Sequence, residues 1–97
     1  MPKFEWDEAK DRSNRRKHGI PFSRAVEIFS NPFIFIPDVR KDYDEKRFNA
    51  VGVSQHYIMN VTFTWRDDLI RIISARPANK KERRMLMDKV QASHQEG

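Results

Sequence analysis

Arginines recur along the segment RIISARPANKKERR, residues 71–84, in a pattern that suits phosphate chemistry. The apolar residues at its start favour a β-strand, which would carry Arg71 within it and Arg76 at its end. A guanidinium group holds its N–H donors in a planar fork that fits the oxygens of a phosphate group. The segment therefore predicts phosphate recognition by both arginines. An ion pair between Arg71 and a carboxylate such as Glu45 or Asp68 would explain that residue equally well.

Positive charge is concentrated in two segments of the 97-residue chain, whose formal net charge is +5. Residues 10–18, KDRSNRRKH, and residues 76–84, RPANKKERR, each hold five bases and one acid. In contrast, residues 38–47 balance four bases against four acids. Two solvated helix faces would also give this pattern, but bases gathered on one surface indicate an anionic partner such as a nucleic-acid backbone. The bases expected to bind backbone phosphates are Arg15, Lys17, Lys80, Arg83 and Arg84.

Proton transfer near neutral pH would fall most naturally to a histidine. His18 directly follows three bases and is the best placed of the three histidines. The last turn of a helix also favours histidine through the helix dipole, so a structural role for His18 stays open. His56 in a hairpin loop and Glu27 at the rim of the expected core are weaker candidates, and His94 lies in the C-terminal tail.

Several chemistries are disfavoured by what the sequence lacks. With no cysteine and three widely spaced histidines, we expect no disulfide framework, no metal site and no cofactor. There is no glycine-rich phosphate loop. The apolar run Phe33–Ile36 is too short to span a membrane, and the N-terminus lacks the apolar stretch of a signal peptide. We therefore expect a cytoplasmic protein without a membrane partner.

Caps and periodicity indicate the elements that position these residues. A helix from the N-cap Asp7 to His18, closed by Gly19, would carry the first basic segment. A final helix, capped by Asn79 and running through about Val90, would carry the second. The other expected elements are a short strand at residues 4–6, a helix from Pro21 to the Asn31–Pro32 break, and strands at residues 33–37, 47–54, 57–65 and 69–75.

This order of elements predicts an α+β fold. We expect a four-stranded, mainly antiparallel sheet, with residues 4–6 as a candidate additional strand. Two N-terminal helices and one C-terminal helix should pack on one face of it. The whole chain, residues 1–97, is expected to form one domain with frayed ends at residues 1–3 and 92–97.

The strand at residues 57–65 alternates between two kinds of side chain. Its odd-numbered residues are bulky and apolar, including Tyr57 and Trp65 at the two ends, and should pack in the core. Its even-numbered residues, with Asn60 and Thr64 among them, should form a second, open face of the sheet.

The turn after this strand decides where the next strand places its arginine. A two-residue turn, at Arg66–Asp67 or Asp67–Asp68, would put Ile70, Ile72 and Ser74 in the core and Leu69, Arg71 and Ile73 on the open face. A three-residue turn would bury Arg71 without a partner, which is costly, so we expect the shorter turn. Arg76 has the opposite parity but lies beside Pro77, where the alternation lapses.

Several stretches of the sequence together resemble one protein family. FEWDEAK, RKHGIPF, EIFSNP, RFNAVGVS and LIRIISAR look like the BrnT family of type II toxin–antitoxin toxins, and the resemblance covers roughly Phe4 to Arg84. It implies a RelE-like fold and a ribonuclease toxin that cleaves RNA and inhibits translation. It also implies neutralisation by a BrnA-like antitoxin with a ribbon-helix-helix domain, and contact with operator DNA only through the toxin–antitoxin complex.

The resemblance extends to particular positions. The family's Lys-His-Gly matches Lys17–Gly19, two of its strand arginines match Arg71 and Arg76, and its Glu-Arg-Arg matches Glu82–Arg84. The chain departs from the family at Asp67 in place of a hairpin glycine, at Pro77 in place of a frequent arginine, at Asn79 in place of a frequent threonine, and at Leu86–Met87 in place of a frequent Tyr-Glu. The expected catalytic residues are Arg71, Arg76 and His18.

RNA can be cut without a metal ion when its own 2′-hydroxyl attacks the adjacent phosphate. The protein must then position the RNA and stabilise the charge of the phosphorane, and arginines suit the second task. We therefore expect a metal-independent endoribonuclease. The alternative is a non-catalytic module that uses the same basic surface to hold nucleic acid or the antitoxin.

Overall fold

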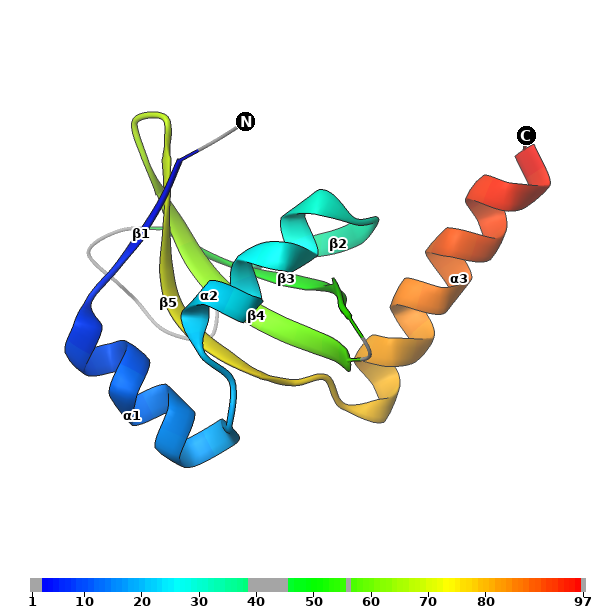
Figure 1. Cartoon of the computed structure of the whole chain (residues 1–97). Coiled ribbons are helices and arrows are strands. Elements are labelled where there is room, and N and C mark those ends of the chain that lie inside the picture. The colour runs from blue at the N-terminus through cyan, green and yellow to red at the C-terminus, as the bar shows by residue number, and fades with distance from the viewer. Residues whose placement is uncertain (1–2, 39–45, 56, 97) are drawn as a thin grey trace.

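The protein combines a mixed β-sheet with helices on both of its faces (Figure 1). The computed structural model describes residues 3–38, 46–55 and 57–96. Over these residues the chain forms a five-stranded sheet, three α-helices and one 3₁₀ helix, which confirms the α+β class. The elements are β1 (Lys3–Trp6), α1 (Glu8–His18), α2 (Phe22–Ala25), η1 (Val26–Ser30), β2 (Phe33–Asp38), β3 (Arg47–Ser54), β4 (Tyr57–Arg66), β5 (Leu69–Pro77) and α3 (Lys80–Glu96), which extends past its expected end at Val90. Among these described helices, none is long and apolar enough to cross a membrane.

The sheet has the strand order β1-β5-β4-β3-β2. β2 to β5 pair antiparallel, each with the next strand along the chain, and β2 lies at one edge. β1 is the additional strand for which residues 4–6 were the candidate, so the sheet has five strands rather than four. β1 pairs in parallel with the first half of β5, which makes the sheet mixed. Tertiary packing holds this short strand in place: the ring of Phe4 lies 5.5 Å from that of Phe29, and Trp6 meets Phe22 edge-on at 6.2 Å.

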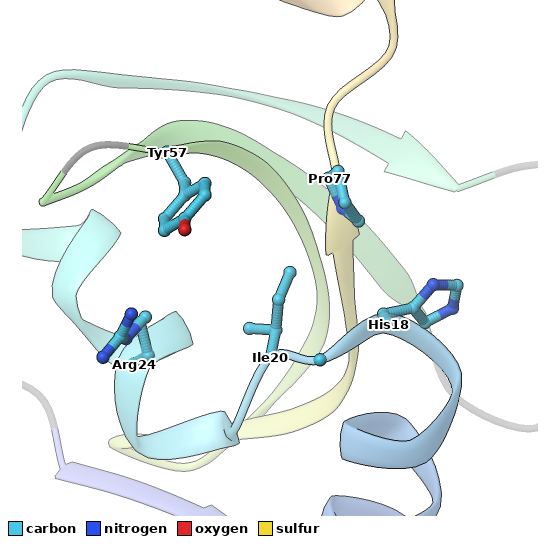
Figure 2. Close-up of a pocket in the computed structure, with 6 residues that line it drawn as sticks. His18, Ile20, Arg24, Tyr57 and Pro77 are labelled. Carbon is cyan, nitrogen blue, oxygen red and sulfur yellow. The ribbon is translucent and has the colours of Figure 1, made fainter.

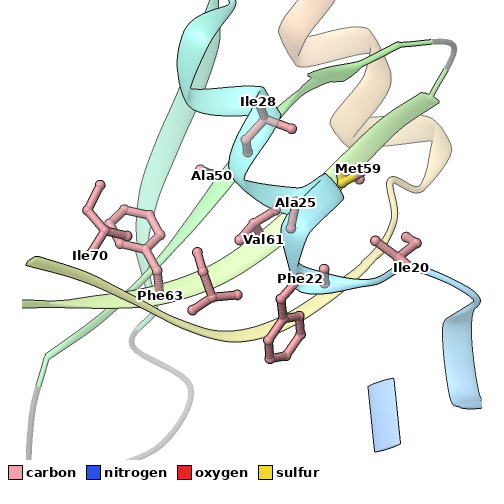
Figure 3. Close-up of a cluster of buried hydrophobic side chains, with 11 residues drawn as sticks. Ile20, Phe22, Ala25, Ile28, Ala50, Met59, Val61, Phe63 and Ile70 are labelled. Atoms are coloured by element: carbon pink, nitrogen blue, oxygen red, sulfur yellow. The ribbon is translucent and has the colours of Figure 1, made fainter. Parts of the chain in front are cut away.

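One face of the sheet is covered by α2 and η1, which build the main apolar core (Figure 3). Phe22, Ala25 and Ile28 are fully buried there, together with Val61 of β4. Gly52 of β3 permits this close approach, because a Cβ atom at that position would lie only 3.0 Å from the Cβ of Ile28. The single helix expected in this region is instead a short α-helix that tightens into a 3₁₀ helix over β3.

α3 packs on the opposite face, which corrects the expectation that all helices share one face. Leu86 is buried against Val51 and Ala78 in a second apolar cluster. Val51 follows Ala50, a member of the first cluster, and successive residues of a strand point to opposite faces. Because β3 is apolar on both faces here, each face needs a cover. The C-terminal half of α3 extends away from the sheet (Figure 1).

The turn between β4 and β5 has the expected length. Arg66 pairs with Leu69 across the two-residue turn Asp67–Asp68, and Asp67 adopts a positive φ of 55°. Asp is among the residue types that tolerate this left-handed conformation, which suits a tight hairpin. The turn confirms the register in which Ile70 and Ile72 enter the core.

A β-bulge in β5 changes the alternation after Ile72. The pairing steps from Phe63–Ile72 to Thr62–Ser74 and leaves Ile73 without an opposite residue. The expected core position of Ser74 is therefore wrong, and Ala75 is buried there instead. Paired residues share a face, so the second face of β4 and β5 comprises Asn60, Thr62, Thr64, Arg71, Ser74 and Arg76. Asn60 and Thr64 are buried, so the expected open face is open only in part.

The aromatic residues at the two ends of β4 are exposed, which corrects their expected place in the core. Tyr57 is 58% exposed and Trp65 is 49% exposed, whereas Met59 and Phe63 between them are buried. β4 is ten residues long, and the packed cluster beneath α2 and η1 reaches only the middle of the strand. The alternation of residue types in β4 predicted correctly which side of the sheet these aromatic residues face. It did not predict how much of the strand α2 and η1 cover.

Candidate functional site

α1 begins and ends as the sequence predicted. Asp7 Oδ1 accepts hydrogen bonds from the backbone N–H groups of Ala9 (2.8 Å) and Lys10 (3.1 Å). These two bonds hold the pKa of Asp7 below its usual range, with a smaller contribution from the charges of Lys10 and Arg71. At the other end, Gly19 adopts φ 72° and closes the helix.

Polar side chains, rather than an apolar stripe, attach α1 to the sheet. Asn14 is 6% exposed, and its Nδ2 donates to the carbonyl oxygens of Ala75 (2.8 Å) and Ile20 (2.9 Å). Its Oδ1 accepts from the N–H of Ala75 at 3.1 Å. Asp11 is also buried and accepts from the N–H of Phe22 at 2.8 Å. These bonds fix α1 along the edge of β5, beyond the residues that pair with β1.

The attachment of α1 creates a basic groove between the helix and β5. Lys10, Ser13, Asn14 and Lys17 follow the spacing i, i+3, i+4, i+7 and so share one side of the helix. Together with His18 and with Ile73 and Ser74 of β5, they line a hollow of about 160 Å³, which we call the α1–β5 groove. Its two lysines stand two helical turns apart, about 10 Å along the axis.

The bases of the α1–β5 groove are free to meet a ligand. Among the described residues, Lys10, Lys17 and His18 have no side-chain hydrogen-bond or ion-pair partner. All three are exposed. Exposed basic side chains beside two hydroxyl groups are suited to an anion with several oxygen acceptors, such as a phosphate.

Arg71 lies on the open face of β5 and is paired with a carboxylate. Its Nη1 donates to Glu5 of β1, the residue directly across the parallel strand pair. Arg71 therefore forms an ion pair, as the alternative interpretation of the sequence expected, but its partner is Glu5 rather than Asp68. Glu45, the other expected partner, lies outside the described residues. Glu5 engages one nitrogen of the guanidinium group, and the Arg71 side chain keeps 24% of its surface exposed. The remaining N–H donors of the Arg71 guanidinium group are therefore available to a ligand.

Arg76 is engaged more completely. Its Nη1 and Nη2 donate to the two carboxylate oxygens of Glu82 at 2.9 and 2.8 Å, in a bidentate pair. Glu82 also accepts from Asn60 Nδ2 (2.8 Å) and from the N–H of Asn79 (3.0 Å). The Asn79 side chain accepts from the N–H of Glu82 at 2.8 Å, which completes a capping box at the start of α3. Arg76 thus joins β5 to α3.

These hydrogen bonds lower the pKa of the Glu82 carboxyl group. Burial raises the pKa, but the hydrogen bonds from Arg76, Asn79 and Asn60 outweigh it and lower the pKa to about 2, against an ordinary value of 4.5. The unfolded state therefore takes up the proton first as the pH falls. The stabilisation supplied by Glu82 is complete above about pH 4.5 and is lost as the pH falls toward 2.

We expect Glu82→Gln to lower the free energy of unfolding at pH 7, and the difference from the unmodified protein to shrink as the pH falls from 4.5 toward 2. Denaturant titrations at several pH values measure this. Asp88→Asn, at an exposed carboxylate of the same helix, should change the free energy of unfolding little at either end of the range. If the difference in the free energy of unfolding between Glu82→Gln and the unmodified protein stayed constant with pH, protonation of Glu82 would not be coupled to unfolding.

The other bases predicted to bind phosphates do not line the groove. Arg15 lies with Arg12 and Arg16 on another side of α1, where its Nε is 3.8 Å from Asp11. The α3 residues predicted to bind phosphates, all exposed in its first two turns, are Lys80, Arg83 and Arg84. Of the predicted site residues, the structure brings Lys17 and His18 together in the groove, whereas Arg71 is not among the residues that line it.

The weaker proton-transfer candidates lie elsewhere. Glu27 of η1 accepts a hydrogen bond from Ser54 Oγ at 2.6 Å, away from the residues that line the groove. His56 and the side chain of His94 lie outside the described residues. Within residues 3–38, 46–55 and 57–96, no three His, Cys, Asp or Glu side chains gather where they could hold a metal ion.

Sequence reasoning missed four residues that shape this region. Lys10 and Ser13 could have been found, because they share the helical spacing of Lys17. Ser74 was misplaced because the bulge is not visible in the alternation. Glu5 gave no local signal, because it lies 66 residues from Arg71 in the sequence.

Comparison with known proteins identifies the family of the chain. No curated protein matches it. The model of one protein family, described as the ribonuclease toxin BrnT of type II toxin–antitoxin systems, matches residues 6–82. That match covers most of the 97 residues, so the chain belongs to the BrnT family of ribonuclease toxins.

Proposed function

We propose that the protein is a metal-independent endoribonuclease toxin that cuts single-stranded RNA at the α1–β5 groove. The observation that carries this proposal is the group of bases Lys10, Lys17 and His18, whose side chains have no partner among the described residues, held beside Ser74 in a chain of a ribonuclease family. The groove lies along the edge of the open sheet face, where an RNA backbone can reach it. RNA is commonly bound as a single strand, through its phosphates and its unstacked bases.

Each group has a distinct task in the proposed reaction. The 2′-hydroxyl attacks the adjacent phosphorus, and the bond to the 5′-oxygen of the next nucleotide breaks, which leaves a 2′,3′-cyclic phosphate and a 5′-hydroxyl. The two lysines hold the flanking phosphates in position. His18 takes part in moving the proton from the 2′-oxygen to the leaving 5′-oxygen. Arg71, two residues before the groove-lining Ile73 on β5, stabilises the negative charge that develops on the phosphorane.

Arg76 has a different task in this proposal from the one expected at first. Both of its terminal nitrogens are committed to Glu82, so it is a positioning residue that fixes the start of α3 against β5. Arg15, Lys80, Arg83 and Arg84 remain proposed contacts for more distant phosphates, because they are exposed and basic.

The proposed biological setting follows from the family. A toxin of a type II system acts with an antitoxin, and we propose a BrnA-like ribbon-helix-helix protein that covers the groove. Cleavage of RNA would inhibit translation, and operator DNA would be contacted only through the toxin–antitoxin complex. A RelE-like fold is proposed on the same basis.

The test is cleavage of a defined single-stranded RNA by the purified protein in the presence of EDTA. Products ending in a 2′,3′-cyclic phosphate, together with resistance of a substrate that has 2′-deoxyribose at the cut position, are expected. Binding without cleavage, on free RNA and on translating ribosomes alike, would instead support the non-catalytic module.

Salt dependence tests the two lysines separately from the chemistry. For single-stranded nucleic acid, each phosphate contact contributes about 0.7 to the slope of log affinity against log salt concentration. We expect Lys10→Ala and Lys17→Ala each to reduce this slope by about that amount. Arg12→Ala removes the same charge from another side of α1 and is the matched control. Equal slopes for all three variants would place the RNA elsewhere.

A further inference from the structure

A second hollow lies on the other side of His18 from the groove. It has a volume of about 170 Å³ and is lined by His18, Gly19, Ile20, Arg24, Tyr57 and Pro77 (Figure 2). His18 lines both hollows, so they meet at this residue. Figure 2 shows the His18 imidazole turned away from Tyr57, and the same side chain borders the α1–β5 groove.

The second hollow has apolar walls and a polar rim. Tyr57 is 58% exposed, although its neighbours in β4 are largely covered. Tyr57 and Pro77 lie on opposite sides of Ile20, which is itself only 8% exposed (Figure 2). Neither the hydroxyl of Tyr57 nor the guanidinium group of Arg24 has a hydrogen-bond or ion-pair partner among the described residues. An exposed ring beside an unpaired guanidinium group is an arrangement that binds nucleobases.

We propose that this hollow, the Tyr57 pocket, takes one unstacked nucleobase of the RNA whose backbone occupies the α1–β5 groove. The inference rests on the proposed function and names a subsite for it. The base stacks on the Tyr57 ring, and Arg24 donates to acceptor atoms on the edge of the base. His18 then stands at the boundary between the base and the neighbouring phosphate, next to the linkage to be cut. Double-stranded RNA keeps its bases stacked and paired, so it cannot fill the pocket.

The test is a double-mutant cycle between the protein and its ligand. The probe is a fully 2′-O-methylated RNA decamer, which cannot undergo cleavage because its 2′-oxygens are blocked. A second series replaces one base at a time by an abasic ribose. Affinity is measured for the unmodified protein, Tyr57→Ala and Tyr57→Phe. Trp65→Ala is the matched control, because Trp65 is the other exposed aromatic residue of β4.

We expect Tyr57→Ala to weaken binding by about 5- to 100-fold, with Tyr57→Phe and Trp65→Ala close to the unmodified protein. One abasic position should cause a similar loss with the unmodified protein and almost no further loss with Tyr57→Ala. Tyr57 is exposed, so its substitution is expected to leave folding intact, and thermal unfolding of each variant verifies this.

Two outcomes would overturn the inference and can be told apart. If the lysine variants weaken binding but Tyr57→Ala does not, the groove binds RNA and the pocket does not take a base. In that case weaker binding of an antitoxin to Tyr57→Ala would assign the pocket to the protein partner. If the unmodified protein fails to bind the RNA at all, the proposed function falls together with the pocket.

Discussion

Replacement of Arg71 by alanine is expected to lower the rate of RNA cleavage by about 10²- to 10³-fold, the usual cost of removing a preorganised donor that stabilises charge in the transition state. Arg71 is suited to this task because both its backbone and its side chain are held in position. The first half of β5 carries its backbone between β1 and β4, and Glu5 on β1 holds one of its nitrogens. The guanidinium group is therefore oriented before RNA arrives, and less ordering is needed during the reaction.

Single-turnover cleavage at saturating protein separates this effect from weaker binding. Arg71→Lys retains the charge but not the planar fork, so we expect a loss of similar direction and smaller size. Glu5→Gln keeps the guanidinium group but weakens its orientation, and should slow cleavage less than Arg71→Ala. If Arg71→Ala lowered affinity for RNA and left the single-turnover rate unchanged, Arg71 would be a binding residue without a role in the chemical step.

The second large effect concerns stability. We expect Asn14→Ala to lower the free energy of unfolding by about 3 kcal/mol, because it leaves several buried backbone groups without a partner. The N–H and the carbonyl of Ala75 and the carbonyl of Ile20 all depend on the Asn14 amide. Removing one partner from a buried hydrogen bond costs more than the bond itself contributed.

Urea titration measures this loss. Ser13→Ala is the control, since Ser13 lies beside Asn14 on α1 and donates no hydrogen bond within the described structure. A change for Asn14→Ala no larger than that for Ser13→Ala would show that water satisfies these backbone groups once the amide is gone. α1 would then be held mainly by Asp11.

Much of the fold was predictable because its signals are local. Asp7 and Gly19 mark the two ends of α1 through cap chemistry that involves only neighbouring residues. The tight turn at Asp67–Asp68 fixed the register of Ile70 and Ile72, since a slip by one residue would have buried Arg71. The bulge at Ile73 was not predictable, because nothing in its residue type distinguishes it from an ordinary strand residue.

The candidate site was harder to predict than the fold. Arg15 and Lys17 are near neighbours in sequence, yet the helix turns them about 200° apart, so only one can face β5. Asp11 and Asn14 looked like members of a solvated helix, but they are the buried contacts of α1. The carboxylates that engage Arg71 and Arg76 come from β1 and α3, and only the assembled sheet brings Glu5 to its arginine.

The polar attachment of α1 has a consequence for its motions. Burial of apolar surface holds α2 and η1 to the sheet, whereas Asn14 and Asp11 hold α1 through a few hydrogen bonds. Such bonds can be exchanged for bonds to water, so we expect α1 to open locally without global unfolding. A ligand that bridges Lys17 and Ser74 would bind only the closed arrangement and would draw the equilibrium toward it. Occupancy of the groove and the order of the helix that forms its wall are therefore thermodynamically linked.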